Sequence, residues 1–431
     1  MPPMTPHALG GTQSAAPTFS TVKMTIGIWI VLLGGNILVG NWVRNADEAD
    51  FGVESTRTAY AILHAGRFSD PFEVMPTGPS SHVAPAYPLL YAAVIVAFGA
   101  GKAAWWAIRV MTLAAYSLQL ALLPRLVAQL GMTSQIGVLA AGVGCLVPIP
   151  GSCYKWEAIF SGLMLVTLAY LTVYLRRAQN VLRIAGILGI GWGIGFLFSP
   201  ATLAVCLAWM PLMWLWTPRA LRTQVSALVV CLAGLMVLPW MIRDYRVFHA
   251  IIFVRDNFGT ELAVSNNDCA APSLRENLPC TKLTHPNHNA GLARRILEIG
   301  EYEFNQEQSR QAGIWMGEHP QRFLTLTAQH FLLFWFPAFA PADGPLVLLT
   351  MLEISVITAL TIPGLVLLCR VNRLASYLLA SGAAAYSVTY YLVQMDYRYR
   401  YPILWISYVA VGYLLKAAAD RFRNRQNAKG V

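Results

Sequence analysis

Long apolar stretches, separated by short polar segments, make up most of this chain. A helix needs about 20 mostly apolar residues to cross the ~30 Å hydrocarbon core of a membrane. Ten stretches come close to this length, so the pattern predicts an all-α polytopic membrane protein with about ten transmembrane helices. The ten stretches are residues 24–43, 103–124, 134–150, 156–175, 182–198, 200–216, 223–242, 344–368, 374–393 and 401–419.

Two further apolar runs are predicted to lie along the membrane surface. Residues 86–99 are too short to cross. Residues 323–339 could cross, but a crossing there would reverse every later loop and move Arg370 and Arg373 to the outside. The stretch 24–43 is expected to stay as an anchor, because no small-residue cleavage site follows it.

The distribution of Lys and Arg sets the predicted orientation, because both residues concentrate in short cytoplasmic loops. An inward N-terminus gives the cytoplasmic side 14 Lys and Arg residues but only one of the 21 acids, Asp420, and it places the first outer loop at residues 44–102. The chain then divides into a cytoplasmic tail at 1–23, spans one to seven at 24–242, a large outer loop at 243–343, spans eight to ten at 344–419 and a basic cytoplasmic tail at 420–431.

Composition supports the membrane assignment. Of the 431 residues, 56% are hydrophobic and 12% are charged, which is about half the charged share of an ordinary soluble protein. Seven cysteines are too few for a disulfide scaffold, and the low charge excludes a disordered chain. The net charge of +10 matters less than the positions of the charges.

The first outer loop opens with a cluster of acids. Asn45 and Glu48 have the spacing of a capping box, which predicts that a helix starts here. In that helix Asp47, Asp50 and Glu54 fall within about 60° of arc on one face. Three such carboxylates can bind a metal or supply a general base, and they can equally face water and stabilise the helix dipole.

Several motifs along the chain carry a family resemblance. The acidic segment is followed by a Gly66-Arg-Phe-Ser turn and a Pro85-Ala-Tyr-Pro segment. The later motifs are Trp192-Gly-Ile-Gly-Phe-Leu-Phe-Ser-Pro-Ala, Leu238-Pro-Trp-Met-Ile-Arg-Asp-Tyr, Asp256-Asn-Phe-Gly-Thr-Glu-Leu, His319-Pro-Gln-Arg-Phe-Leu and Arg398-Tyr-Arg-Tyr-Pro. In this order they resemble the GT-C membrane glycosyltransferases. The likeness is greatest to the bacterial family-39-like enzymes related to protein O-mannosyltransferases and the lipid A aminoarabinose transferase.

The resemblance implies an inverting glycosyltransferase. Such enzymes move a sugar from a polyprenyl-phosphate carrier to a glycolipid, polysaccharide or protein acceptor on the extracytoplasmic face of the cell membrane. It also implies a carboxylate in the first loop as general base, with Asp50 and Glu54 ranked ahead of Asp47. His82 and Ala84-Pro85 replace the family's frequent Lys-Pro-Pro pattern, so His82 and Tyr87 become candidate donor contacts in this segment.

Three arginines are candidate contacts for the carrier phosphate. Arg243 lies at the outer end of the seventh span. Arg398 and Arg400 lie in a short outer loop, where the distribution of positive charge disfavours them, and this suggests pairing with phosphate. The competing explanation is that Asp396 neutralises one of them and lipid headgroups the other.

Two smaller sites and a rival function complete the predictions. His285 and His288 with Asp268 suggest a metal site, but Pro286 prevents a helical pair, so no metal is assigned there and a divalent cation elsewhere stays open. Cys269 and Cys280 are predicted to form a disulfide. The rival function is a transporter or flippase of lipid-linked sugars. It is disfavoured because the span interiors are nearly free of charge, with Arg109 and Glu353 near the outer ends. Membrane lipids are expected partners, and nucleic acid is not.

Overall fold

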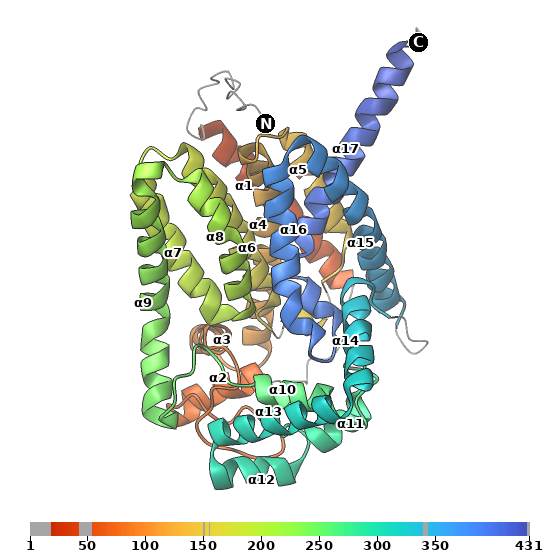
Figure 1. Cartoon of the computed structure of the whole chain (residues 1–431). Helices are drawn as coiled ribbons and strands as arrows, with labels where there is room; N and C mark the ends of the chain where they lie inside the picture. The colour runs from red at the N-terminus through yellow and green to blue at the C-terminus, as the bar shows by residue number, and fades with distance from the viewer. Residues whose placement is uncertain (1–18, 43–53, 150, 155, 339–343, 429–431) are drawn as a thin grey trace, which may run out of the picture.

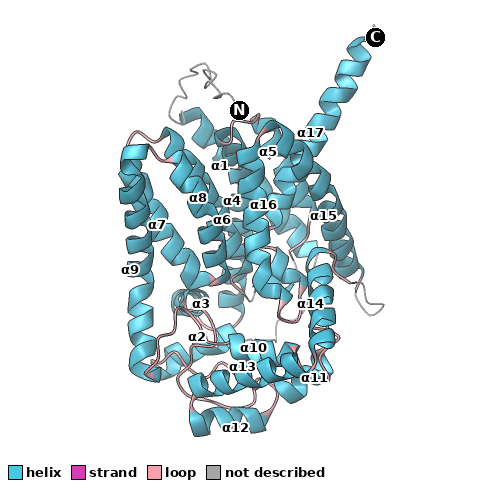
Figure 2. Cartoon of the chain, viewed as in Figure 1, coloured by secondary structure: helices cyan, strands magenta, loops and turns pink. Residues whose placement is uncertain are grey.

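A computed structural model describes residues 19–42, 54–149, 151–154, 156–338 and 344–428. Within these ranges the chain is helical and forms no β-strand, which confirms the predicted all-α class for this part of the protein (Figure 2). The acids Asp47 and Asp50 lie outside the described residues.

Ten long helices form a bundle, and each predicted span contains one of them. They are α1 (Phe19–Trp42), α4 (Lys102–Gln129), α5 (Ser134–Leu146), α6 (Ala158–Tyr174), α7 (Val181–Phe198), α8 (Ala201–Trp216), α9 (Arg222–Phe248), α15 (Pro345–Val371), α16 (Arg373–Ser387) and α17 (Leu404–Ala428). Among the described residues, five helical segments are long and apolar enough to cross a membrane. These segments are Lys102–Gln129, Ala158–Arg177, Val181–Phe198, Arg219–Phe248 and Val347–Val371. The apolar helices indicate a membrane protein, while ten crossings remain a prediction.

Close backbone contact between α7 and α9 explains part of the glycine-rich pattern. A Cβ atom on Gly189 would lie 2.9 Å from the carbonyl oxygen of Val229, and one on Gly193 would lie 2.5 Å from the Cβ of Met236. The two glycines therefore let the helices approach each other, as small residues do in membrane bundles.

The other α-helices of the described residues form a layer at one end of the bundle. They are α2 (Glu54–Ala65), α3 (Ala86–Phe98), α10 (Phe258–Ser265), α11 (Leu278–Thr284), α12 (Ala290–Ile299), α13 (Glu301–Glu318) and α14 (Pro320–Trp335). Figure 1 shows α2 and α10–α13 together at this end, while the last turns of α17 project at the opposite end. Short 3₁₀ turns complete the structure at η1 (Gly151–Tyr154), η2 (Leu175–Arg177), η3 (Arg219–Leu221), η4 (Val388–Tyr391) and η5 (Tyr397–Arg400).

Two features shape this outer layer. Gly300 adopts φ +87°, which favours glycine, and it divides the helical pattern of residues 292–318 into α12 and α13. A disulfide joins Cys269, in the loop after α10, to Cys280 of α11. The predicted interfacial runs are the helices α3 and α14.

Candidate active site

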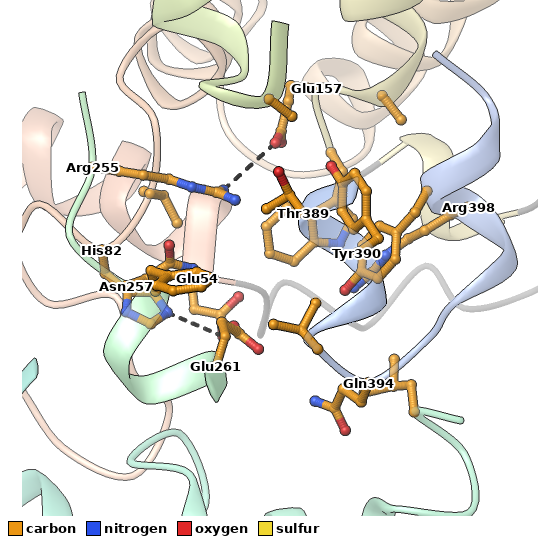
Figure 3. Close-up of a pocket in the computed structure, with 18 of the residues that line it drawn as sticks. Glu54, His82, Glu157, Arg255, Asn257, Glu261, Thr389, Tyr390, Gln394 and Arg398 are labelled. Atoms are coloured by element: carbon orange, nitrogen blue, oxygen red, sulfur yellow. Dashed lines mark ion pairs between the residues drawn. The ribbon is translucent and has the colours of Figure 1, made fainter. Parts of the chain in front are cut away.

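A cavity of about 440 Å³ lies where the outer helices meet the bundle (Figure 3). Its charged lining comes from segments far apart in the sequence, namely Glu54, Glu73, Glu157, Arg255, Glu261 and Arg398. Three histidines, His82, His285 and His288, also line it, together with aromatic rings from Trp156, Phe258, Tyr386, Tyr390 and Tyr399. The mixture of acids, guanidinium groups and aromatic rings is suited to a polar, ring-bearing ligand.

Glu54 is the one predicted acid that the described residues contain, and it faces this cavity. It is the first residue of α2, and its side chain is 14% exposed. Burial, together with the nearby Glu261 carboxylate, raises the pKa of Glu54 to about 7, although Arg398 and Arg255 act in the opposite direction. A carboxyl group with this pKa can gain or lose a proton near neutral pH, as a general base must.

His82 lies beside Glu54, with its Nε2 atom 4.0 Å from Oε1 of the carboxyl group. Burial lowers the pKa of His82 well below its usual value, and His285 and Arg255 lower it further. The imidazole is therefore neutral at pH 7. Since a neutral ring cannot replace a lysine as a cationic phosphate ligand, the structure argues against that role for His82.

The cationic groups of the cavity are Arg255 and Arg398, which Figure 3 shows on different walls. Arg255 lies 3.8 Å from Glu157. Arg398 lies 3.6 Å from Asp396, and its guanidinium carbon is 4.7 Å from the centre of the Trp156 ring. Sequence reasoning missed Arg255, although it immediately precedes the Asp256-Asn-Phe-Gly motif.

Three other predicted donor contacts do not line the cavity. Arg243 donates to the carbonyl oxygens of Phe68 and Ser80 and to Asp244, so its guanidinium group holds the first loop in place.

Arg400 is fully buried; it packs over the ring of Trp335 and donates to Thr358 and Ser407. The Tyr87 hydroxyl donates to the carbonyl of Tyr154 at 2.7 Å. Each of these side chains has structural contacts that the sequence pattern could not reveal.

The turn that carries His82 is held from several sides through Ser81. The backbone N–H of Ser81 donates to Glu301 at 2.6 Å, and its hydroxyl group donates to Asp244 at 2.9 Å. Its carbonyl oxygen accepts from the backbone N–H of Asp256 at 2.8 Å. Residues from α9, α13 and the loop before α10 thus fix the position of His82.

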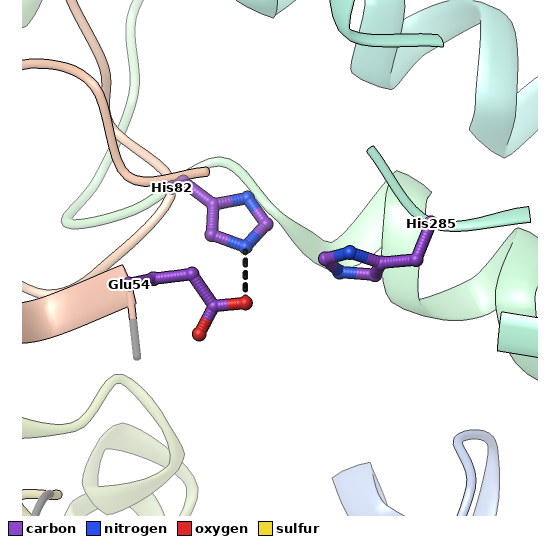
Figure 4. A group of neighbouring side chains, drawn as sticks. All are labelled: Glu54, His82 and His285. Atoms are coloured by element: carbon purple, nitrogen blue, oxygen red, sulfur yellow. Dashed lines mark ion pairs between the residues drawn. The ribbon is translucent and has the colours of Figure 1, made fainter. Parts of the chain in front are cut away.

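Glu54, His82 and His285 form the one group of potential metal ligands found among the described residues (Figure 4). One ligand atom from each lies within 4.8 Å of the others. Asp268, considered above with His285 and His288 without a metal being assigned, is not part of this group and accepts a hydrogen bond from the Trp315 indole at 2.7 Å.

No protein-family model matches the sequence, and no curated protein matches it either. Among solved structures, the chain is similar to the oligosaccharyltransferase of Archaeoglobus fulgidus. The apo form superposes with a TM-score of 0.57 at 13% identity, covering 95% of this chain and 52% of that one. The complex with an inhibitory peptide and a dolichol-phosphate gives a TM-score of 0.56 at 14% identity, covering 97% and 53%.

The complex of the same enzyme with Zn and sulfate gives a TM-score of 0.52 at 14% identity, covering 86% of this chain and 45% of that one. This chain therefore shares the fold of the matched part of the archaeal enzyme and spans about half the length of that enzyme. At such low identity the likeness concerns the fold.

Proposed function

We propose that the protein is an inverting glycosyltransferase of the family-39-like kind, which moves a sugar from a polyprenyl-phosphate carrier to an acceptor. One observation carries the proposal: a buried carboxyl group, Glu54, shares a cavity with the two guanidinium groups of Arg255 and Arg398. The GT-C fold and the sequence motifs support it. The archaeal enzyme, which was solved with a dolichol-phosphate, offers a precedent for a lipid-linked donor.

The chemistry follows from charge and geometry. Glu54 removes the proton of the acceptor hydroxyl group while the hydroxyl oxygen attacks the anomeric carbon of the sugar. The bond between that carbon and the phosphate oxygen breaks, and the lipid phosphate leaves with increased negative charge. Arg255 and Arg398 stabilise this charge in a partly desolvated cavity, where each donor is worth more than in water. The backside attack inverts the anomeric centre.

The aromatic lining fits the remaining part of the donor. Tyr390 and Tyr399 stack with ring centres 4.6 Å apart, and both line the cavity with Trp156. Such rings pack against the apolar face of a sugar while their polar edges hydrogen-bond. Asp47 and Asp50 remain alternative bases in the same acidic segment.

We further propose the location of this site. With ten spans and both termini in the cytoplasm, the outer layer of helices and the cavity lie on the extracytoplasmic face of the cell membrane. There the carrier lipid reaches the cavity from the bilayer, and a glycolipid, polysaccharide or protein acceptor reaches it from outside.

The test starts from cells with and without the protein. Their surface glycans and glycolipids are compared to identify the sugar and the acceptor. Purified protein in detergent is then given the corresponding labelled polyprenyl-phosphate sugar. We expect the natural protein to transfer the sugar to the acceptor and the Glu54→Gln variant to transfer none. Movement of labelled carrier lipid across vesicles without any transfer would instead support the flippase.

A further inference from the structure

Glu54, His82 and His285 have the donor atoms and the spacing of a zinc site, but their surroundings do not match one. A histidine that binds a metal through one ring nitrogen almost always donates the other N–H to a carboxylate, a carbonyl or water. The His285 Nδ1 atom instead accepts a hydrogen bond from the backbone N–H of Asn287 at 3.0 Å. Among the residues that the structure describes, the buried Nδ1 atom of His82 has no hydrogen-bond partner. The Nδ1 atom of His285 therefore fails this test.

The contact with Asn287 also fixes where the proton of His285 lies. A backbone N–H can only donate, so Nδ1 of His285 must be the unprotonated nitrogen and Nε2 must carry the proton. Burial, together with the nearby His288, lowers the pKa of His285 to about 3, so the ring carries one proton near pH 7. A protonated Nε2 has no lone pair for a metal ion.

That proton faces acidic groups. The Nε2 atom lies 4.0 Å from Oε1 of Glu261, and the ring also borders the Glu54 carboxyl group (Figure 4). The charged and titratable groups around Glu54 are Glu261, His82, His285, Arg255 and Arg398. The two carboxyl groups repel each other when both are ionised, and an N–H dipole between them offsets this repulsion.

We propose that His285 is a positioning residue: its Nε2–H, held by the Asn287 amide, faces Glu54 and Glu261 and occupies the place where a metal ion would otherwise join them. This inference rests on the proposed role of Glu54 as base. His285 keeps the Glu54 carboxylate available to the acceptor without binding substrate itself. The site then needs no divalent cation.

The experiment uses the full-length protein in detergent with three variants. His285→Phe keeps a planar ring of similar size and removes the N–H, whereas His285→Gln restores an N–H donor near the Nε2 position. His64→Phe is the matched control, because His64 is exposed on α2. Transfer is measured between pH 5 and 9 after EDTA treatment. Bound zinc is measured by mass spectrometry, and the ring proton by NMR of [¹⁵N]histidine-labelled protein.

We expect no stoichiometric zinc and no loss of rate after EDTA treatment. In His285→Phe the acidic limb of the pH–rate profile should move up by about one pH unit, since a carboxylate that loses a nearby N–H dipole is protonated more readily. His285→Gln should move it back, and His64→Phe should match the natural protein. Stoichiometric zinc that disappears in His285→Phe, or an unchanged acidic limb, would overturn the proposal.

The NMR measurement separates this inference from the proposed function. The resonances that His285→Phe removes should show a protonated Nε2 and an unprotonated Nδ1 from pH 5 to 8, whether or not transfer is found. The opposite tautomer would disprove the role of His285 even in an active glycosyltransferase. If the expected tautomer is found but no transfer occurs, the proposed function is refuted, whereas the inferred position of the His285 proton is retained.

Discussion

Replacing Glu54 by Gln should abolish activity and stabilise the folded protein at alkaline pH. The pKa of Glu54 is about 7 in the folded state, against an ordinary value of 4.5. Each pH unit of difference corresponds to about 1.4 kcal/mol, so ionising Glu54 in the folded protein costs about 3 kcal/mol. Because the side chain is 14% exposed, solvent screens little of this cost.

The direction in which pH changes the free energy of unfolding follows from proton binding. Between pH 4.5 and about 7 the folded protein holds the Glu54 proton more tightly than the unfolded chain does, so raising the pH lowers the free energy of unfolding. This contribution is complete below pH 4.5 and is lost as the pH rises through 7. Gln cannot ionise, so Glu54→Gln avoids the loss.

Thermal unfolding in detergent, followed by tryptophan fluorescence, measures the effect. We expect Glu54→Gln to unfold at a temperature a few degrees above the natural protein at pH 8 and at the same temperature near pH 4. Sugar transfer by Glu54→Gln should fall to background at both pH values. Equal unfolding temperatures at pH 8 would show that the carboxyl group is not buried as described, and retained transfer would show that Glu54 is not the base.

Four further predictions concern other parts of the protein. Transfer by the natural protein should rise with pH through an apparent pKa near 7, because the base acts when ionised; a flat profile between pH 5 and 9 would exclude Glu54. Arg255→Gln and Arg398→Gln should each lower kcat about 10²–10³-fold in donor-transfer assays, whereas Arg295→Gln on the exposed surface of α12 should leave it unchanged. Arg243→Gln should destabilise the fold by about 3 kcal/mol in unfolding assays by leaving the buried Asp244 carboxylate without its ion pair, and normal stability would restore Arg243 as a candidate donor contact. Replacing Cys269 and Cys280 by Ser should lower the free energy of unfolding by about 3 kcal/mol, from the chain entropy of a loop of this length, and mass spectrometry without reductant should detect the bond in the natural protein.

Helices were the part of the structure that the sequence could predict. A run of about 20 apolar residues has few stable alternatives to a helix in a membrane, so each predicted span contains one. Local signals also worked within the outer loops, where residues 86–99 and 323–339 became α3 and α14.

The site was predicted only in part, since it depends on contacts between distant segments. Glu54 and Arg398 were recognised because the local sequence makes them unusual, an acid after a span and a cation in an outer loop. Arg255, Glu261 and His285 gain their positions from the packing of the outer loop against α2, and nothing next to them in sequence shows it.

Arg243 and Arg400 show the reverse case. Both were predicted to lie at the membrane boundary, where phosphate contacts are expected. In the structure Arg243 donates to backbone carbonyl oxygens, and Arg400 packs over the ring of Trp335. Whether a boundary arginine is free for a ligand depends on the partners that the fold supplies.

The attachment of Ser81 to three separate segments affects how mutational scans of this protein should be interpreted. Changes at Asp244 or Glu301 would shift the neighbouring His82 and depress turnover, although neither side chain lines the cavity. A screen that scores activity alone would therefore assign too many residues to the active site. Scoring protein abundance for the same library would separate residues that support the turn carrying His82 from residues that contact the sugar.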